Sequence, residues 1–69
     1  MHVKFTIYDS IHYNVKWKTK HIPRIGDLIF VDRFFSEDFL KKHSIIEYLL
    51  KVDQVIWYKS HVELLLLNQ

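Results

Sequence analysis

The chain has 69 residues, of which 49% are hydrophobic and 26% are charged. This length allows one small domain, and this balance is typical of a folded protein rather than of a disordered segment. The absence of cysteine excludes disulfides and thiolate-held metals, and a formal net charge of +2 is too small to indicate a nucleic-acid-binding protein by itself.

Two alternating segments at the start of the chain predict a β-hairpin. Apolar and polar residues alternate over residues 3–7 and again over residues 13–19, with Asp9 and Ser10 between them. We expect an odd-length loop centred on Ser10, or a bulge beside it, because only such a register matches apolar residues throughout. That register pairs Ile7 with Tyr13, Phe5 with Val15 and Val3 with Trp17.

The only proline and the only glycine mark a turn. Pro23 and Gly26 fall together in residues 21–27, where glycine tolerates positive φ and proline restricts the residue before it. The apolar run 28–31 follows. Because it is apolar on both faces, we expect a strand that is covered, at least in part, on both sides.

Residues 36–43 predict a helix of about two turns. Ser36 is suited to cap its start, Glu37 lies in its first turn and Lys42 near its end, so the charges complement the helix dipole. We expect Phe39 and Leu40 to point inward.

The last third predicts a second hairpin, with a turn at Lys59–Ser60. This turn pairs Trp57 with Val62 and Val55 with Leu64 on one face, and Tyr58 with His61 and Ile56 with Glu63 on the other. Before Val55, the apolar set changes phase at Asp53–Gln54, which predicts a bulge or sharp bend.

Five short, curled strands and one short helix predict a mainly β fold. We expect residues 1–69 to form a single small, five-stranded, SH3-like antiparallel barrel with a helical insert near residues 36–43. An OB-fold is the second choice, because that fold places its helix between strands three and four.

The turn and the last two strands also resemble a family. Residues 23–29, Pro-Arg-Ile-Gly-Asp-Leu-Ile, resemble the P-x-[I/V]-G-D-x-[I/V] turn of small uncharacterised bacterial proteins. In those proteins a V-x-x-V-x-W segment and a V-x-L-x-L strand follow, as in residues 52–57 and 62–66 here. The resemblance covers most of residues 1–67 and departs at the insert 33–47. It implies an SH3-like barrel and no particular function.

No group of residues predicts catalysis. A single glycine excludes a glycine-rich phosphate loop, and no Ser, His and Asp residues form a recognisable nucleophile motif. The five histidines lack metal-ligand spacing, so we expect ordinary surface histidines, no metal and no cofactor. They are His2, His12, His21, His43 and His61.

The aromatic residues support a protein-binding hypothesis, because a barrel this small cannot bury all eleven of them. The alternative is that the aromatic residues of the insert plug an open end of the barrel. The candidate binding residues are Phe34, Phe35, Phe39, Tyr48 and Tyr58.

The basic residues support a second hypothesis, single-stranded nucleic-acid binding. Residues 1–24 carry a net charge of +4, and alternation along the strand 16–24 would place its lysines on one face, with Tyr13 or Trp17 as a stacking surface. The alternative is an edge strand that lysines protect against aggregation. The candidate cations are Lys16, Lys18, Lys20 and Arg24.

We therefore expect a non-enzymatic binding or regulatory module, with a protein partner favoured over nucleic acid. A monomer or weak dimer is expected. The longest aliphatic run, residues 64–67, is far shorter than the roughly 20 residues of a membrane span. Residues 1–5 lack the apolar segment of a signal peptide, which predicts a cytoplasmic protein.

Overall fold

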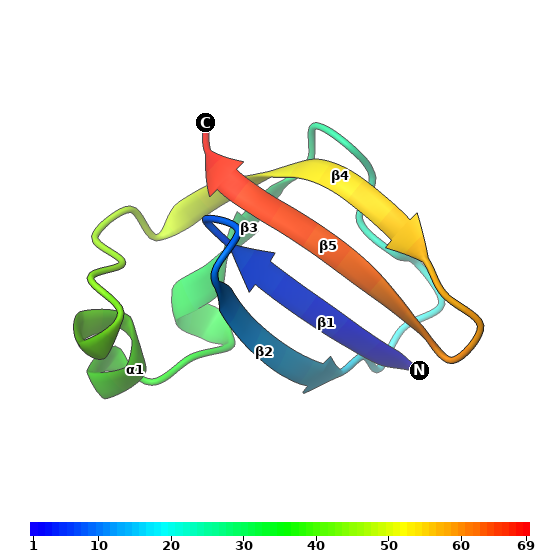
Figure 1. Cartoon of the computed structure of the whole chain (residues 1–69), viewed down its shortest axis with the longest axis horizontal. Coiled ribbons are helices and arrows are strands. Elements are labelled where there is room, and N and C mark those ends of the chain that lie inside the picture. The colour runs from blue at the N-terminus through cyan, green and yellow to red at the C-terminus, as the bar shows by residue number, and fades with distance from the viewer.

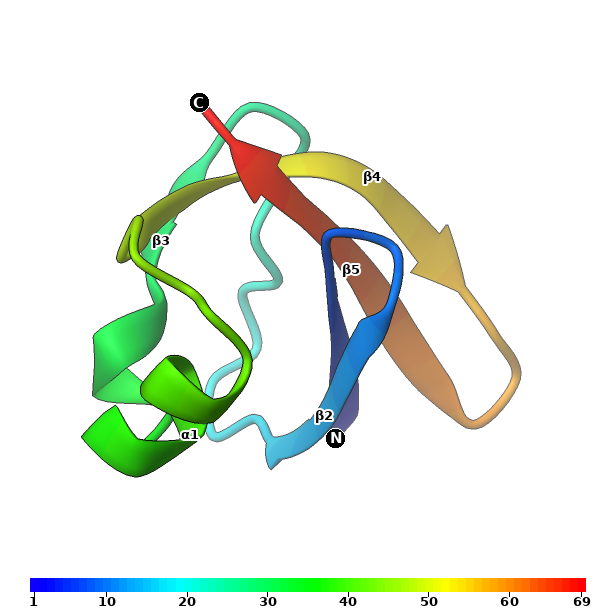
Figure 2. The ribbon, with the colours of Figure 1, turned by 60° about the vertical axis from the view of Figure 1, so that its left-hand side comes forward.

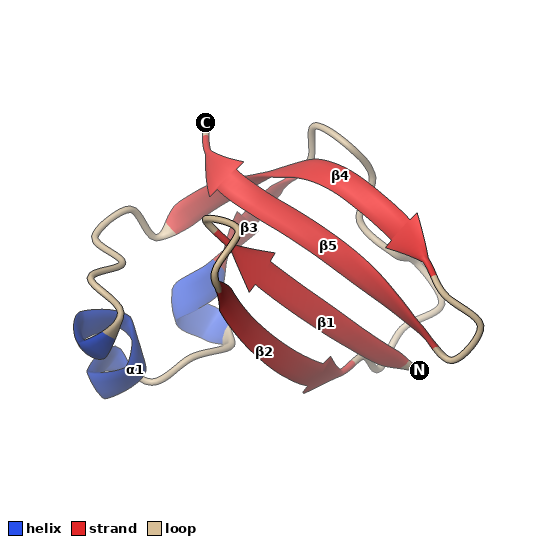
Figure 3. Cartoon of the chain, viewed as in Figure 1, coloured by secondary structure: helices blue, strands red, loops and turns tan.

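A computed structural model describes all 69 residues and consists of one five-stranded sheet, one short α-helix and one 3₁₀ turn (Figure 1). The mainly β fold class is thus confirmed, and helical residues occur only between β3 and β4 (Figure 3). The elements are β1 (His2–Ile7), β2 (Ile11–Lys16), β3 (Leu28–Phe30), η1 (Val31–Arg33), α1 (Glu37–Lys42), β4 (Leu49–Trp57) and β5 (His61–Asn68).

The strands follow the order β2-β1-β5-β4-β3, so β2 and β3 form the two edges. The sheet curls into a half-barrel, and η1 and α1 lie across its open side (Figure 2). This architecture is consistent with a small SH3-like or OB-like barrel. One detail of the prediction is wrong, because β1 and β5 run parallel while the other neighbours are antiparallel. Parallel neighbours require a long connection, and here it includes β2, β3, the helices and β4.

The β1–β2 hairpin has the predicted odd-length loop but not the predicted register. The loop is Tyr8–Ser10, centred on Asp9, and the pairs are Ile7 with Ile11, Phe5 with Tyr13 and Val3 with Val15. Tyr8 and Asp9 have φ of 53° and 61°, and the Ser10 N–H donates to the Ile7 carbonyl, as in a type I′ turn. A two-residue slip keeps every side chain on its face, so alternation alone could not distinguish the two registers.

The turn before β3 is confirmed, and its glycine is required by the backbone. Gly26 has φ of 94°, the Asp27 N–H donates to the Arg24 carbonyl, and the Asp27 carboxylate accepts the Arg24 N–H at 2.8 Å. The Gly26 N–H donates to the carbonyl of Val52 on β4 at 2.8 Å. These bonds hold the turn against β4.

The prediction that residues 28–31 are covered on both faces is wrong. Ile29 and Val31 are buried, but Leu28 and Phe30 are 48% and 50% exposed. The physical reason is that β3 is a three-residue edge strand, and no element of the chain covers its outer face.

The predicted helix is confirmed as α1. Ser36 caps it by accepting the Phe39 N–H at 3.2 Å, acidic residues occupy its first turn, and Lys41 and Lys42 occupy its last. Leu40 is buried as predicted, whereas Phe39 is only half-buried. A helix this short depends on such packing.

The β4–β5 hairpin is confirmed in register and in its bulge. Val55 pairs with Leu64 and Trp57 with Val62, and the Tyr58 N–H donates to the His61 carbonyl at 2.8 Å. The register shifts between Val52 and Gln54, which leaves Asp53 as the extra residue. Such a bulge increases the twist of a strand, as the curl of the sheet requires.

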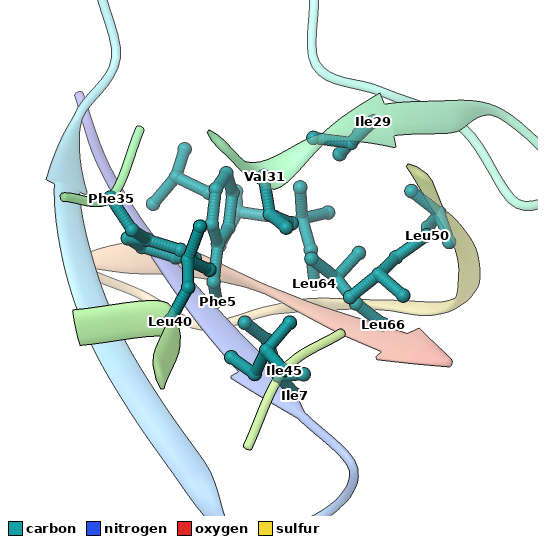
Figure 4. Close-up of a cluster of buried hydrophobic side chains, with 13 residues drawn as sticks. Phe5, Ile7, Ile29, Val31, Phe35, Leu40, Ile45, Leu50, Leu64 and Leu66 are labelled. Atoms are coloured by element: carbon teal, nitrogen blue, oxygen red, sulfur yellow. The ribbon is translucent and has the colours of Figure 1, made fainter. Parts of the chain in front are cut away.

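The hydrophobic core lies on the inner, concave face of the sheet. Side chains of β1, β4 and β5 meet those of η1 and α1 there, and Phe35 and Leu40 lie beside Phe5 (Figure 4). The core residues are Val3, Phe5, Ile7, Ile29, Val31, Phe35, Leu40, Ile45, Leu50, Val52, Val62, Leu64 and Leu66.

Candidate functional site

The aromatic residues of the insert pack against β2. Phe35 lies 4.5 Å from Tyr13 and 5.9 Å from Phe5, ring centre to ring centre, and Phe39 lies 5.1 Å from Tyr13. Phe34 stacks on Trp17 at 5.7 Å. We call Tyr13, Trp17, Phe34, Phe35 and Phe39 the aromatic plug. It fills the gap between β2 and the helical segment, so these contacts favour the packing alternative for Phe34, Phe35 and Phe39.

The other two candidate aromatic residues lie at opposite ends of β4. Tyr48 precedes the strand and borders a hollow of about 370 Å³ beside η1 and α1. Tyr58 follows the strand, stacks on His61 at 4.6 Å and donates its hydroxyl to Glu63 at 3.1 Å. The five residues of the protein-binding hypothesis therefore do not form one surface.

A different apolar surface occupies the outer face of the sheet, where β3 and the adjoining parts of β4 and β5 meet. Phe30 pairs with Leu49, and Leu28 and Leu67 flank Lys51 from its two sides. Side chains alternate between faces, so the run Leu64–Leu67 places two leucines on each face. We call this surface the outer apolar patch. It consists of Leu28, Phe30, Leu49, Leu65 and Leu67.

The patch departs from the usual pattern of an antiparallel sheet, whose solvent face is polar. Leu28 and Phe30 are about half exposed, whereas Leu49, Leu65 and Leu67 are half-buried between their neighbours. The sequence-based candidates missed this surface, although the four consecutive leucines are its visible signal.

The other half of the outer face holds a hydrogen-bonded network around Glu63, which is only 8% exposed. Thr6 Oγ1 and the Tyr58 hydroxyl donate to its carboxylate, and Lys4 lies 3.9 Å away. His12 Nδ1 lies 3.1 Å from Thr6 Oγ1, whose own proton goes to Glu63, so the histidine must be the donor there.

These contacts explain the ionisation of the network. The Thr6 hydrogen bond lowers the pKa of Glu63 and outweighs the effect of burial, with Tyr58, Lys4 and His12 contributing further. The hydrogen bond that the Tyr58 hydroxyl donates to Glu63 raises the pKa of Tyr58. Every buried side-chain nitrogen and oxygen of the chain has a partner. The hydrogen-bonding groups of the network are therefore all paired within the chain. No sequence pattern predicted this network.

The largest hollow of the molecule is a groove of about 680 Å³ between residues 20–27 and the end of β4. Lys20, His21 and Arg24 line one side, and Trp57 lines the other. We call it the Trp57 groove. Trp57 is 63% exposed, although it pairs with Val62, which is buried in the core.

The prediction that residues 16–24 form one basic strand is wrong. β2 ends at Lys16, and the chain turns after Trp17, whose backbone N–H donates to the Met1 carbonyl at 2.8 Å and whose indole N–H donates to the His21 carbonyl at 2.9 Å. Lys18, Lys20 and Arg24 therefore do not share a strand face. β2 is an edge strand, as the alternative interpretation required, but only Lys16 lies on it.

The candidate nucleic-acid residues consequently separate. Lys20 and Arg24 line the Trp57 groove, whereas Lys16 and Lys18 border another hollow beside Phe34. Tyr13 and Trp17 pack within the aromatic plug. No group of three or more histidine, aspartate or glutamate residues could hold a metal ion.

No protein-family model matches the chain, and no match was found among curated proteins or among solved structures. The resemblance of residues 23–29 to small bacterial proteins and the cytoplasmic location therefore stay predictions. None of the helices is both long enough and apolar enough to cross a membrane.

Proposed function

We propose that the protein is a non-enzymatic binding module whose partner is another protein, and that it docks through the outer apolar patch. The observation that carries this proposal is the half-exposed pair Leu28 and Phe30 on an edge strand, continuous with the leucines of β4 and β5. Contiguous exposed apolar surface on a small protein typically marks an interaction site.

The backbone of β3 adds to the proposal. The Val31 N–H donates to the Tyr48 carbonyl and the Val52 N–H to the Asp27 carbonyl, so residues 27 and 31 direct their backbone groups toward β4. In an antiparallel ladder the direction alternates, which turns the N–H and C=O groups of Leu28 and Phe30 toward the free edge. A partner strand could hydrogen-bond there while its side chains cover the patch.

Polar residues at the patch give it specificity. Lys51 lies between Leu28 and Leu67, and the Arg33 guanidinium lies 5.8 Å from the centre of the Phe30 ring. A second copy of this surface would present the same cations rather than acidic side chains. We therefore favour a different protein, one that offers an apolar strand flanked by acidic side chains.

Photo-crosslinking tests the proposal directly. A photoreactive phenylalanine analogue at position 30 should give one defined crosslinked product in cells that produce the protein. The same analogue at Lys42, exposed on α1, is the matched control and should not give that product. The substitution Leu28→Ser should abolish the product while the thermal unfolding temperature stays within a few degrees, because Leu28 is half exposed.

The proposal fails if position 30 gives no product, if both positions give the same one, or if the product survives Leu28→Ser. A crosslinked homodimer would replace the proposed partner with a second copy of the chain.

A further inference from the structure

Three adjoining hollows surround the end of the molecule that carries the β4–β5 turn. The Trp57 groove is the first, and a second hollow shares Trp57 with it. A third hollow, on the outer face, shares Ser60 and His61 with the second. Because neighbouring hollows share these residues, we treat the three as one surface, which we call the tip track. Its principal side chains are Lys4, Lys20, Arg24, Trp57, Lys59 and His61.

The charge of the tip track is strongly positive. Its lining includes Lys4, Lys20, Arg24 and Lys59, and Asp27 is the only acidic residue that lines it. Lys4 lies 3.9 Å from Glu63, so Lys20, Arg24 and Lys59 are the cations available to a ligand. The Asp27 carboxylate accepts the Arg24 N–H, so it is occupied within the turn. The chain as a whole carries only +2. The positive charge is therefore concentrated at this end, where it attracts a polyanion.

The tip track also holds a free aromatic face. The indole of Trp57, 63% exposed, joins the first two hollows, and it takes part in no ring contact and no side-chain hydrogen bond of the structure. Beside it, Tyr58 stacks on His61 with nearly parallel planes, 12° apart. An uncommitted tryptophan among cations is the arrangement on which unpaired bases stack.

The backbone that carries these groups is held in place. The Trp17 indole donates to the His21 carbonyl and to Thr19 Oγ1, at 2.9 and 3.0 Å, which fixes the segment bearing Lys20. The Gly26 N–H bond to Val52 fixes the turn bearing Arg24. Trp17 is thus a positioning residue, and the stacking role predicted for it passes to Trp57.

We propose that the tip track binds single-stranded nucleic acid. Lys20 and Arg24 on one side of Trp57 and Lys59 on the other contact three phosphates, and one base stacks on the indole. A duplex would present only its phosphates, because its bases are already stacked. This site is separate from the outer apolar patch and does not depend on the proposed protein-binding function.

Fluorescence anisotropy with labelled oligo-dT and oligo-rU of about 12 nucleotides tests the proposal, since single strands occupy about 4–16 nucleotides on such small barrels. If three phosphates are contacted, affinity should fall about 20-fold between about 50 and 200 mM salt. A DNA duplex of equal length and a poly-glutamate peptide are the comparison ligands, and both should bind more weakly than the single strands.

Substitutions separate stacking from charge. Trp57→Ala should weaken binding about 5-fold to 100-fold, and Trp57→Phe should recover part of the loss. The double variant Lys20→Gln/Arg24→Gln should weaken binding and reduce its salt dependence. Lys41→Gln/Lys42→Gln on α1 removes the same charge far from the tip track and should leave binding nearly unchanged.

The site takes either single-stranded RNA or single-stranded DNA, and a preference for oligo-rU or oligo-dT in the binding assay identifies which one. The proposal is overturned if neither strand binds, if poly-glutamate or the duplex binds as tightly as the single strands, or if Trp57→Ala leaves the affinity unchanged. Equal losses in the two double variants would also overturn it, because the effect would then reflect net charge alone.

Discussion

The substitution Phe35→Ala tests whether the aromatic plug stabilises the fold. Phe35 is 5% exposed and contacts the rings of Phe5, Tyr13 and Phe39 at 4.5 to 5.9 Å. Removing a buried phenylalanine side chain costs about 3–5 kcal/mol, because transfer free energy and cavity formation add. A chain of 69 residues is expected to have about 3–10 kcal/mol of total stability. The variant should therefore lose a large part of it.

Phe30→Ala is the matched control, since it deletes the same atoms from a half-exposed position. Full burial of a phenylalanine is worth about 1.5–3 kcal/mol, so half of this, about 1 kcal/mol, is expected with no cavity term. If Phe35→Ala does not fold, Phe35→Leu replaces it, with an expected cost of about 1–2 kcal/mol from the lost aromatic contacts.

Urea unfolding measures both variants, followed by far-UV circular dichroism and by tryptophan fluorescence, to which both Trp17, stacked on Phe34, and the exposed Trp57 contribute. With a slope of about 1 kcal/mol per molar urea, Phe35→Ala should lower the midpoint by about 3–5 M and Phe30→Ala by about 1 M. Equal shifts in the two variants would refute the assignment of Phe35 to the core. Phe35 would then again be a candidate for partner binding through an exposed side chain.

Two further substitutions test local features of the structure. The folded-state pKa of Glu63 is lowered from its ordinary value of 4.5, so its stabilising contribution is fully present above that value and is lost as the pH falls through the folded-state pKa. Glu63→Gln should accordingly flatten the acid side of the stability profile measured by urea unfolding, and unchanged profiles would contradict the network. Gly26→Ala should cost about 1 kcal/mol in the same assay, because Gly26 has φ of 94° and only the backbone, not a steric contact, opposes a Cβ there. A cost near zero would mean that this turn does not constrain the residue.

The elements that local chemistry dictates could be predicted from the sequence. Ser36 with the acidic and basic residues after it predicts α1, and the phase change at Asp53–Gln54 predicts the bulge. The β4–β5 register was also predictable. A single turn at Lys59–Ser60 pairs Trp57 with Val62 and Val55 with Leu64, which places apolar residues opposite each other on one face of the sheet. In each case the prediction depends on residues close together in the chain, where helix capping and the pairing of neighbouring strands decide the local structure.

The candidate site was less predictable. The sequence identified aromatic and basic residues as chemically relevant, but it could not separate Phe35, which is buried, from Phe30, which is half exposed. It assigned stacking to Tyr13 or Trp17, whereas the structure packs both within the aromatic plug and leaves Trp57 exposed. Exposure depends on which distant segment covers a residue, and composition does not contain that information.

The sequence by itself determined the strand and helix content, the Gly26 turn, the bulge and the absence of cysteine chemistry, because these follow from residue type and short-range spacing. Only the tertiary structure decided that β1 and β5 run parallel, and that β3 is an edge whose outer side chains stay exposed. It also brought Lys20 and Arg24 to Trp57, and Thr6 to Glu63. These contacts join residues more than thirty positions apart in the chain, so they follow from how the sheet curls and which edges remain open.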